Sequence, residues 1–422
     1  MLALLKQRSF GAMTASQFLG AFNDNAFKAL VLFLAASLSK DNPLPWVESS
    51  RMAQTFGQAL PHTLFALPFV LLGPLTGVLA DRISKTRIVW WANAMEIGVM
   101  VCACVAFSLQ VYDLLMATVL LMGAQSALFG PAKYGIIKEL VGEKDLAKAN
   151  SLIQASTMLA ILSGTVVGGI FAQRFGGQLW QAGVAYVIFA FIGWAVSLLM
   201  GRTPPADPGR KQTYNPVSTF IGHWSAVEGD RVLALAILSS GFFYMMAALF
   251  MQIVIAYGTW LGLPEASTAT LHAMTGMGVI LGAWLSGRIS GDGVAGFLIP
   301  VGLLGLAAST FLMLLAPENV SLLRISLFCM GTSSGLFTIP IRCLIQGRPK
   351  SARRGSIQGL AEVIDFIGIL MAGPLFYLGE KVFECTPHTM YIAAGMTVAA
   401  YACLTFSMRR AQMSREASET VA

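Results

Sequence analysis

Long apolar segments separated by short polar connections run through the whole chain. Each segment approaches or exceeds the about 20 residues that cross a bilayer as a helix, so the pattern predicts an all-α integral membrane protein. An even number of spans would place both termini on one side of the membrane. The twelve predicted transmembrane helices lie near residues 10–38, 55–80, 88–108, 113–137, 149–173, 180–200, 232–260, 267–288, 293–315, 322–346, 356–379 and 389–408.

The composition agrees with this pattern. Of the 422 residues, 56% are apolar and 12% are charged. Soluble domains average about 25% charged residues, so a soluble globule is excluded. A spanning β-strand needs only about ten alternating residues, and the continuous apolar runs therefore favour helices over a barrel.

Basic residues gather in alternate connections between the predicted helices. The positive-inside rule places the connections richer in Lys and Arg, and with them both termini, in the cytoplasm. The net charge of +7 is therefore a topology signal and not a nucleic-acid footprint. The basic connections contain Arg82, Lys85, Arg87, Lys138, Lys144, Lys148, Arg202, Arg210, Lys211, Arg348, Lys350, Arg353, Arg354, Arg409, Arg410 and Arg415. The opposite connections contain little beyond Lys40, Arg51, Arg174, Arg324 and Lys381.

A proline-rich polar stretch interrupts the helical pattern at residues 201–230. We interpret it as a cytoplasmic linker between a bundle at residues 1–200 and a second bundle at residues 231–422. The part from Pro216 to Val227 is predicted to form a short interfacial helix.

Two short sequence matches indicate that the two bundles are related by duplication. Residues 123–129 correspond to residues 331–337 with an offset of 208, and residues 77–81 correspond to residues 282–286 with an offset of 205. In transporters, such a repeat places the substrate site between the two halves.

Asp24 is the most informative charged residue, because it lies about 14 residues into an apolar segment. An ionised carboxylate near the bilayer midplane costs about 2.5–3.5 kcal/mol, so it is expected to face a polar pathway or a partner. Asn23 and Asn25 add polarity beside it. The alternative is a simple pair with Lys28 one turn along the same helix.

Other ionisable residues lie in predicted spans and are candidate ligands for a charged substrate. Lys133 follows Gly130-Pro131, where we expect a helix break beside a cavity, although a lysine there can also extend to the headgroups. Glu362 and Asp365 share a helix face and could bind an ammonium group, a proton or a cation. Pairing of these carboxylates with Arg342 is the structural alternative.

A loop motif follows the end of the second predicted helix. Its defining positions are occupied by Gly77, Asp81, Arg82, Ser84 and Arg87. It resembles the Gly-x-x-x-Asp-Arg-x-Gly-basic motif of the major facilitator superfamily, with Ser84 in place of the usual glycine. The resemblance implies a major facilitator fold and a gating role for Gly77, Asp81, Arg82 and Arg87, rather than substrate contact.

A narrower resemblance rests on four segments. Together they resemble the bacterial lysophospholipid transporter family and the membrane domain fused to acyltransferase and acyl-carrier-protein ligase modules. In that family Asp24, Lys133 and Glu362 match polar binding positions, but its arginine in the seventh helix has no counterpart, because no Arg or Lys occurs between Arg231 and Arg288. Arg342 is a candidate replacement, since its planar fork suits phosphate. The segments are residues 17–25, 129–137, 148–157 and 357–362.

The resemblance implies that the protein moves lysophospholipids from the outer to the inner leaflet of the bacterial cytoplasmic membrane. A soluble acyltransferase or acyl-carrier-protein ligase is then an expected partner, together with membrane lipids. One alternative is a proton- or sodium-coupled exporter of small amphiphiles or drugs, and another is a membrane scaffold that docks an acyltransferase. No catalytic triad, zinc spacing or phosphate loop occurs in the sequence, so we expect no enzymatic activity, no metal and no cofactor.

Overall fold

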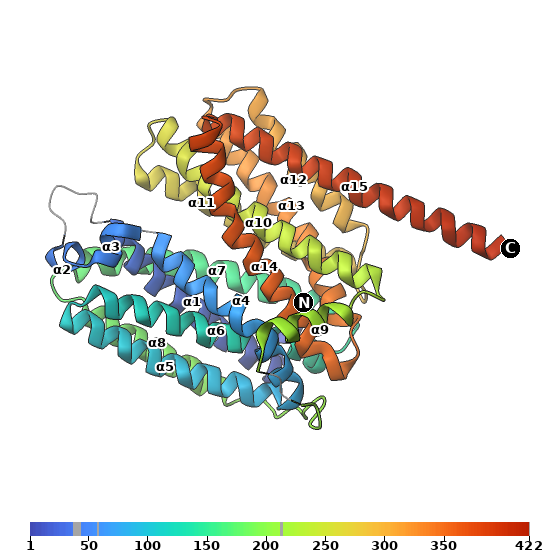
Figure 1. The fold of residues 1–422 in the computed structure, drawn as a ribbon, viewed down its shortest axis with the longest axis horizontal. Coiled ribbons are helices and arrows are strands. Elements are labelled where there is room, and N and C mark those ends of the chain that lie inside the picture. Colours follow the sequence, from blue (N-terminus) through green and yellow to red (C-terminus); the bar gives the residue numbers. More distant parts are fainter. Residues whose placement is uncertain (37–43, 57–58, 212–213, 422) are drawn as a thin grey trace.

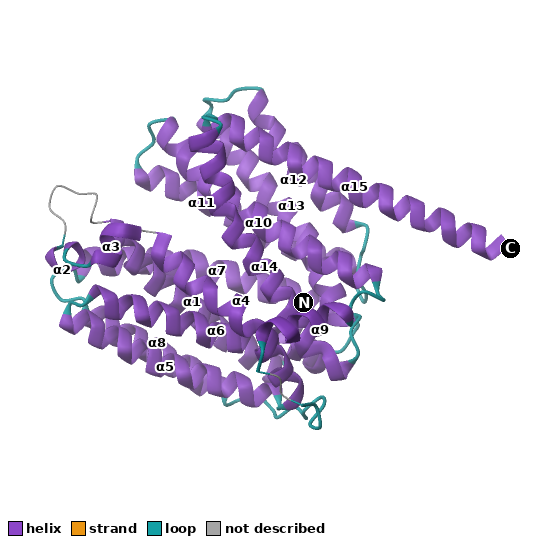
Figure 2. Ribbon diagram, in the orientation of Figure 1, coloured by secondary structure: helices purple, strands orange, loops and turns teal. Residues whose placement is uncertain are grey.

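The computed structural model describes residues 1–36, 44–56, 59–211 and 214–421. Helices and their connections account for all of this described part, as Figure 2 shows. The N-terminal group of main helices comprises α1 (Arg8–Ala36), α4 (Ala59–Arg82), α5 (Lys85–Leu109), α6 (Tyr112–Val141), α7 (Leu146–Arg174) and α8 (Trp180–Ser197). The C-terminal group comprises α10 (Arg231–Trp260), α11 (Glu265–Ser290), α12 (Leu298–Phe311), α13 (Val320–Gly347), α14 (Arg354–Tyr377) and α15 (Pro387–Val421).

Most of these helices have the length and composition of membrane spans. Within the described residues, ten helices are long and apolar enough to cross a bilayer. The α12 helix and the 3₁₀ turn after it, Leu298–Leu314, form a shorter apolar segment. Short helices α2 (Pro45–Glu48) and α3 (Arg51–Phe56) lie between α1 and α4.

The short helix predicted for the linker is confirmed as α9 (Pro216–Ser225), which lies between the two groups along the chain, and its position at the membrane interface stays a prediction. Asn215 caps it, because its side-chain oxygen accepts hydrogen bonds from the Val217 and Ser218 backbone N–H groups, and Pro216 occupies the first turn. Asp230 caps α10 in the same way, by accepting from the Leu233 N–H.

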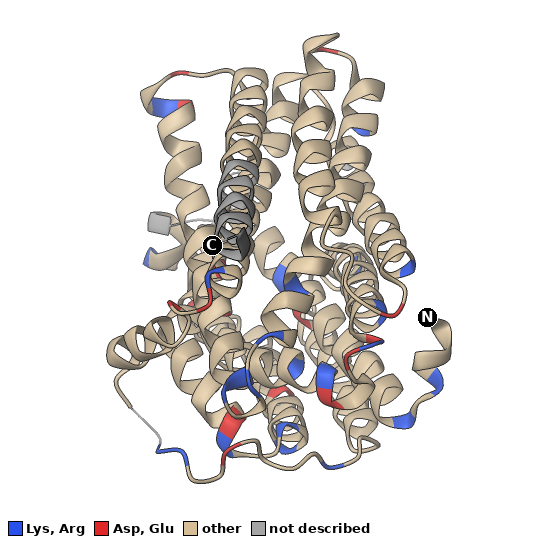
Figure 3. Cartoon of the chain, turned by 90° about the vertical axis from the view of Figure 1, so that its right-hand side faces the viewer, with Lys and Arg blue, Asp and Glu red and all other residues tan. Residues whose placement is uncertain are grey.

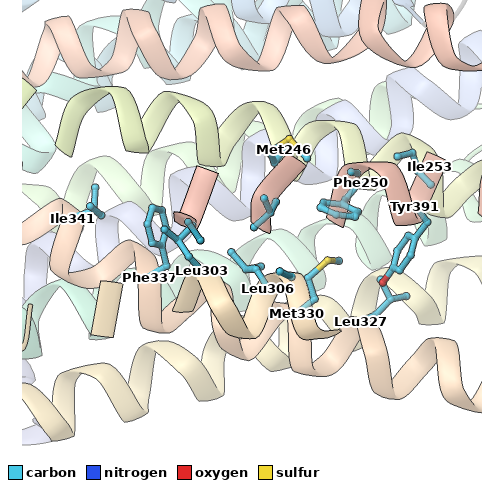
Figure 4. Close-up of a cluster of buried hydrophobic side chains, with 14 of the residues drawn as sticks. Met246, Phe250, Ile253, Leu303, Leu306, Leu327, Met330, Phe337, Ile341 and Tyr391 are labelled. Atoms are coloured by element: carbon cyan, nitrogen blue, oxygen red, sulfur yellow. The ribbon is translucent and has the colours of Figure 1, made fainter. Parts of the chain in front are cut away.

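Each group has its own buried apolar core. One core runs through the N-terminal group and includes Phe27, Phe107 and Tyr186. The other runs through the C-terminal group, where Met246, Phe250, Leu306, Leu327, Met330, Phe337 and Tyr391 interdigitate (Figure 4).

Two glycines on equivalent helices support the predicted internal repeat. A Cβ added at Gly123 of α6 would overlap the Phe65 carbonyl of α4, and one added at Gly331 of α13 would overlap the Thr275 carbonyl of α11. Both helix pairs therefore pack backbone against backbone, and the two pairs hold the second and fourth positions within their groups.

The two groups touch along α4 and α14 at the end of the molecule that we call the basic end, where the loops rich in Lys and Arg lie. Figure 1 shows the groups converging near α9 and diverging toward the end that holds α2 and α3. Gly77 of α4 lies so close to α14 that an added Cβ would be 2.9 Å from the Gly355 carbonyl oxygen, and Gly359 of α14 abuts the Gly73 carbonyl. Figure 3 looks onto this end and shows Lys and Arg there, with Asp and Glu among them.

Candidate functional site

Asp24 lies on α1, half-buried, and contacts α6. Its Oδ2 accepts a hydrogen bond from the Ser126 hydroxyl at 3.2 Å. Its Oδ1 is buried without a hydrogen-bond partner in the described part of the chain. The Lys28 ammonium lies over the Phe65 ring, 4.2 Å from the centroid, and forms no ion pair with Asp24 among the described residues. The simple Asp24–Lys28 pair is therefore not formed at contact distance, although the two charges interact electrostatically.

Arg342 on α13 is the most strongly held cation of the site. It is 7% exposed, and its Nη2 donates to Asp365 Oδ2 at 3.1 Å and to the Tyr244 hydroxyl at 2.9 Å. The guanidinium carbon also lies 4.6 Å from the ring centroid of Tyr134 and 5.3 Å from that of Tyr244. Its Nη1 is buried with no partner in the described part, so one donor nitrogen remains available to a ligand.

Arg342 therefore reaches α10, which has no Arg or Lys after Arg231 at its first residue. Tyr244 lies on α10, the seventh main helix, and holds the guanidinium against that helix. Sequence reasoning did not identify Tyr244 or Tyr134. A tyrosine inside an apolar span is a weak signal, since it also occurs in ordinary packing.

The two carboxylates of α14 have different environments. Asp365 forms the ion pair with Arg342. Glu362 is 5% exposed, and it forms no ion pair within the described residues. Its carboxylate lies against Gly130 of α6, where an added Cβ would overlap it, and its Oε2 has no hydrogen-bond partner there. The predicted pairing with Arg342 thus applies to Asp365 and not to Glu362.

Lys133 on α6 lies between these groups. Its ammonium is 5.0 Å from the Tyr134 ring centroid, and its charge interacts with those of Glu362, Arg342 and Asp24. The predicted helix break at Gly130-Pro131 is wrong, because α6 continues from Tyr112 to Val141 with Pro131 inside it. A proline removes one backbone donor without ending a helix when packing on both sides supports the remaining turns.

Asn25 has a local role in the structure. Its side-chain amide donates to the Ala21 carbonyl of its own helix at 2.7 Å, and its Cβ faces Gly164 of α7. Glu96 of α5 accepts a hydrogen bond from Asn23 of α1 at 2.9 Å, an interhelical packing contact.

The motif at the end of α4 lies at the basic end and joins the two groups. Asp81 is fully buried and accepts hydrogen bonds from the Gly355 N–H at 2.7 Å, the Ser356 N–H at 3.0 Å and the Ser356 hydroxyl at 2.6 Å. A carboxylate at the N-terminus of α14 is favoured by the free N–H groups and the helix dipole. The linker residue Arg210 donates to Asp81 Oδ2 at 3.0 Å.

Further contacts close the basic end. Asn150 of α7 and Gln346 of α13 exchange two amide hydrogen bonds, at 2.7 and 3.0 Å, and Lys138 donates to the Gly347 carbonyl at 2.9 Å. Within the described residues, hydrogen bonds that directly join the N-terminal and C-terminal groups occur at this end. Arg82 and Arg87 lie beside the Asp81 contacts and line a surface cavity.

Two groups of six main helices, with a charged cluster between them and Asp81 capping a helix of the other group at one end, are the architecture of a membrane transporter. The chain belongs to the Major Facilitator Superfamily, whose family model matches residues 16–373. Among solved structures, the human organic anion transporter MFSD10 superposes with a TM-score of 0.77 at 13% identity, covering 94% of this chain and 98% of that one. The fucose transporter FucP in its outward conformation superposes with a TM-score of 0.71 at 12% identity, covering 93% and 97%.

Within the superfamily, the sequence relatives confirm the narrower resemblance to lysophospholipid transporters. The lysophospholipid transporter LplT of Serratia proteamaculans is 28% identical over 97% of this chain and 98% of its own length. That of Pectobacterium carotovorum is 30% identical, covering 82% and 80%.

Proposed function

We propose that this protein moves lysophospholipids from the outer to the inner leaflet of the cytoplasmic membrane by alternating access. In this proposal residues 1–200 and 231–422 are the two moving domains, residues 201–230 link them, and both termini are cytoplasmic. A soluble acyltransferase or acyl-carrier-protein ligase would then restore the missing acyl chain. The names of the similar proteins support the substrate class, and the basic loops support the orientation.

One observation supports the substrate site most directly: unsatisfied charged atoms of both signs lie where the two groups meet. Arg342 Nη1, Glu362 Oε2 and Asp24 Oδ1 are all buried without a hydrogen-bond partner in the described part. Buried polar atoms normally have partners, and leaving one unpaired costs about 1–3 kcal/mol. A lysophospholipid headgroup supplies a phosphate for Arg342 and Lys133, and in lysophosphatidylethanolamine also an ammonium for Asp24 or Glu362.

The alternative is a proton- or sodium-coupled exporter of amphiphiles. The carboxylates of Asp24 and Glu362 favour it, because neither forms an ion pair in the described residues and both could bind a coupling ion. The same residues could also couple lysophospholipid transport to an ion gradient.

Reconstituted vesicles distinguish these functions. We expect labelled lysophosphatidylethanolamine in the outer leaflet to become protected from an external quencher in vesicles that contain the protein. Protection should fall about tenfold in Asp24→Asn and Lys133→Gln, since each removes one charge contact worth about 1.4 kcal/mol. The matched control is Asp113→Asn, which lies in the first turn of α6 away from the cluster. The same vesicles are then assayed with an imposed proton gradient, with an imposed sodium gradient and without any gradient.

Lysolipid movement without any gradient identifies a flippase, and movement only with a gradient identifies coupled lysolipid transport. Failure of lysolipid to move under every gradient, combined with gradient-driven movement of an amphiphilic dye, would establish the exporter.

A further inference from the structure

A small cavity at the basic end lies outside the proposed substrate site. Its volume is about 250 Å³, and we call it the arginine cavity. It is formed where the α4–α5 connection meets the first residues after α8. Its walls are Arg82, Ile83, Ser84, Arg87, Arg202, Thr203 and Pro205.

The charges of this cavity are not balanced by the protein. Arg82, Arg87 and Arg202 line it, and no carboxylate does. None of these three arginines forms an ion pair in the part of the chain that the structure describes. Arg202 lies 5.7 Å from the Trp90 ring centroid, which orients its guanidinium without neutralising it. Three like charges around one small space repel each other unless an anion binds among them.

Further hydrogen-bond donors without partners also favour an anion in this cavity. Ser84 is 7% exposed, and its hydroxyl is buried with no hydrogen-bond partner among the described residues. The Nε of Arg82 is likewise buried without a partner there. Ser84 also immediately precedes the 25-residue helix α5, and its side chain does not cap that helix. The Thr86 N–H already donates to the Thr203 hydroxyl at 3.5 Å, and the dipole and the other first-turn N–H groups of a helix favour an anion at this position.

We propose that the arginine cavity binds a phosphate group, supplied either by a lipid headgroup of the adjacent leaflet or by free phosphate. Guanidinium groups pair with phosphate through two parallel hydrogen bonds, and a hydroxyl and helix N–H groups complete such a site. A neighbouring cavity of about 750 Å³ shares Arg202, Thr203 and Pro205 and adds Arg8 and Glu139, whose carboxylate is already paired with Lys85 at 2.6 Å. This second cavity provides room for the remainder of a lipid headgroup. A lipid phosphate and free phosphate can therefore make the same contacts in the arginine cavity.

The test uses the full chain and the variant Arg202→Gln, because Arg202 lies outside both the substrate cluster and the Asp81 contacts. The control is Arg174→Gln, an exposed arginine at the far end of α7. In the first arm, inorganic phosphate is titrated into detergent-solubilised, delipidated protein at constant ionic strength, and thermal unfolding is followed. In the second arm, unfolding is compared in phosphate-free buffer between nanodiscs of anionic phosphatidylglycerol and nanodiscs of phosphatidylcholine, whose phosphate is offset by its own choline.

We expect a rise in melting temperature in at least one arm, and an apparent affinity about tenfold weaker in Arg202→Gln, as for loss of one bidentate contact. A rise with inorganic phosphate alone identifies free phosphate, and a rise with phosphatidylglycerol alone identifies a lipid headgroup. Arg202→Lys should restore part of the shift, which separates charge from folding. The proposal is overturned if neither arm separates wild type from Arg202→Gln, or if Arg174→Gln loses the same shift.

Discussion

Arg342 brings a positive charge from α13 to the side of α10. It extends from α13 to Tyr244 of α10, and it keeps Nη1 free while Nη2 binds Asp365 and Tyr244. Lys could supply the charge, but its single ammonium nitrogen could not make these contacts and also leave a second donor nitrogen free for a ligand, as Nη1 of Arg342 does.

We therefore expect the rate of lysophospholipid transport to fall by about tenfold in Arg342→Lys and by about 100-fold in Arg342→Ala. Initial rates in reconstituted vesicles provide the measurement. Full activity of Arg342→Ala would remove Arg342 from the proposed site. Arg324→Ala is the control, because Arg324 is an exposed arginine on the same helix.

The sequence identified most charged members of the cluster, because an ionised residue in an apolar span has few other uses. The family resemblance singled out Glu362, but local spacing alone did not show that Arg342 pairs with Asp365 and not with Glu362. That distinction depends on how α13 packs against α14, and hydropathy contains no information about it. The sequence also pointed to a break at Pro131, whereas packing keeps α6 continuous.

At the scale of elements, the N-terminus of α14 depends on a residue from another helix. Asp81 of α4 satisfies two of its N–H groups and the Ser356 hydroxyl. The family motif predicted a gate here, but neither the Arg210 contact nor the Asn150–Gln346 pair could be inferred from local spacing.

Removing this carboxylate should loosen the start of α14. We expect Asp81→Ala to cost about 1–3 kcal/mol of local stability, because the buried donors lose their acceptor. Hydrogen–deuterium exchange of residues 354–358 in nanodiscs should then become about 5–100-fold faster. Asp113→Ala is the control, since Asp113 accepts a similar hydrogen bond from Ser50 within the N-terminal group. Unchanged exchange in Asp81→Ala would contradict a capping role.

The Asp230–Arg348 pair ties the start of α10 to the end of α13 outside the membrane spans. The hydrogen bond from Arg348 lowers the pKa of Asp230 below its usual value. Its contribution to stability is therefore present above the unfolded pKa of about 3.9 and is lost as the pH falls through the lower folded value. Both side chains are partly exposed, so we expect a screened contribution of no more than about 1 kcal/mol.

Asp230→Asn tests this pair, because asparagine keeps the helix cap and removes the charge. Its melting temperature in detergent should be slightly below that of the wild type at pH 7, and the difference should shrink as the pH falls below about 4. A difference that persists undiminished at lower pH would show that the ion pair is not its source.

At the scale of the whole molecule, the structure is closed at the basic end. Asn150 Nδ2 lies 3.7 Å from the sulfur of native Cys343 across the boundary between the groups. We expect Asn150→Cys to form a disulfide with Cys343 under oxidation and to stop transport until the bond is reduced. Gel mobility after cleavage between the groups and transport before and after reduction are the measurements.

The double variant Asn150→Cys, Cys343→Ser is the control and should be insensitive to the oxidant. Undiminished transport by a fully cross-linked protein would show that the basic end need not open.

The glycine contacts between α4 and α14 have a further consequence for such opening. Gly73 and Gly77 meet Gly355 and Gly359 backbone to backbone. Glycine has no side-chain rotamers, so no side chain at these four positions has to rearrange when the helices part. The hydrogen bonds of Asp81 must therefore break for this seam to open, and the Asn150–Gln346 and Lys138–Gly347 contacts must break with them, so the separation of the two groups is a concerted event.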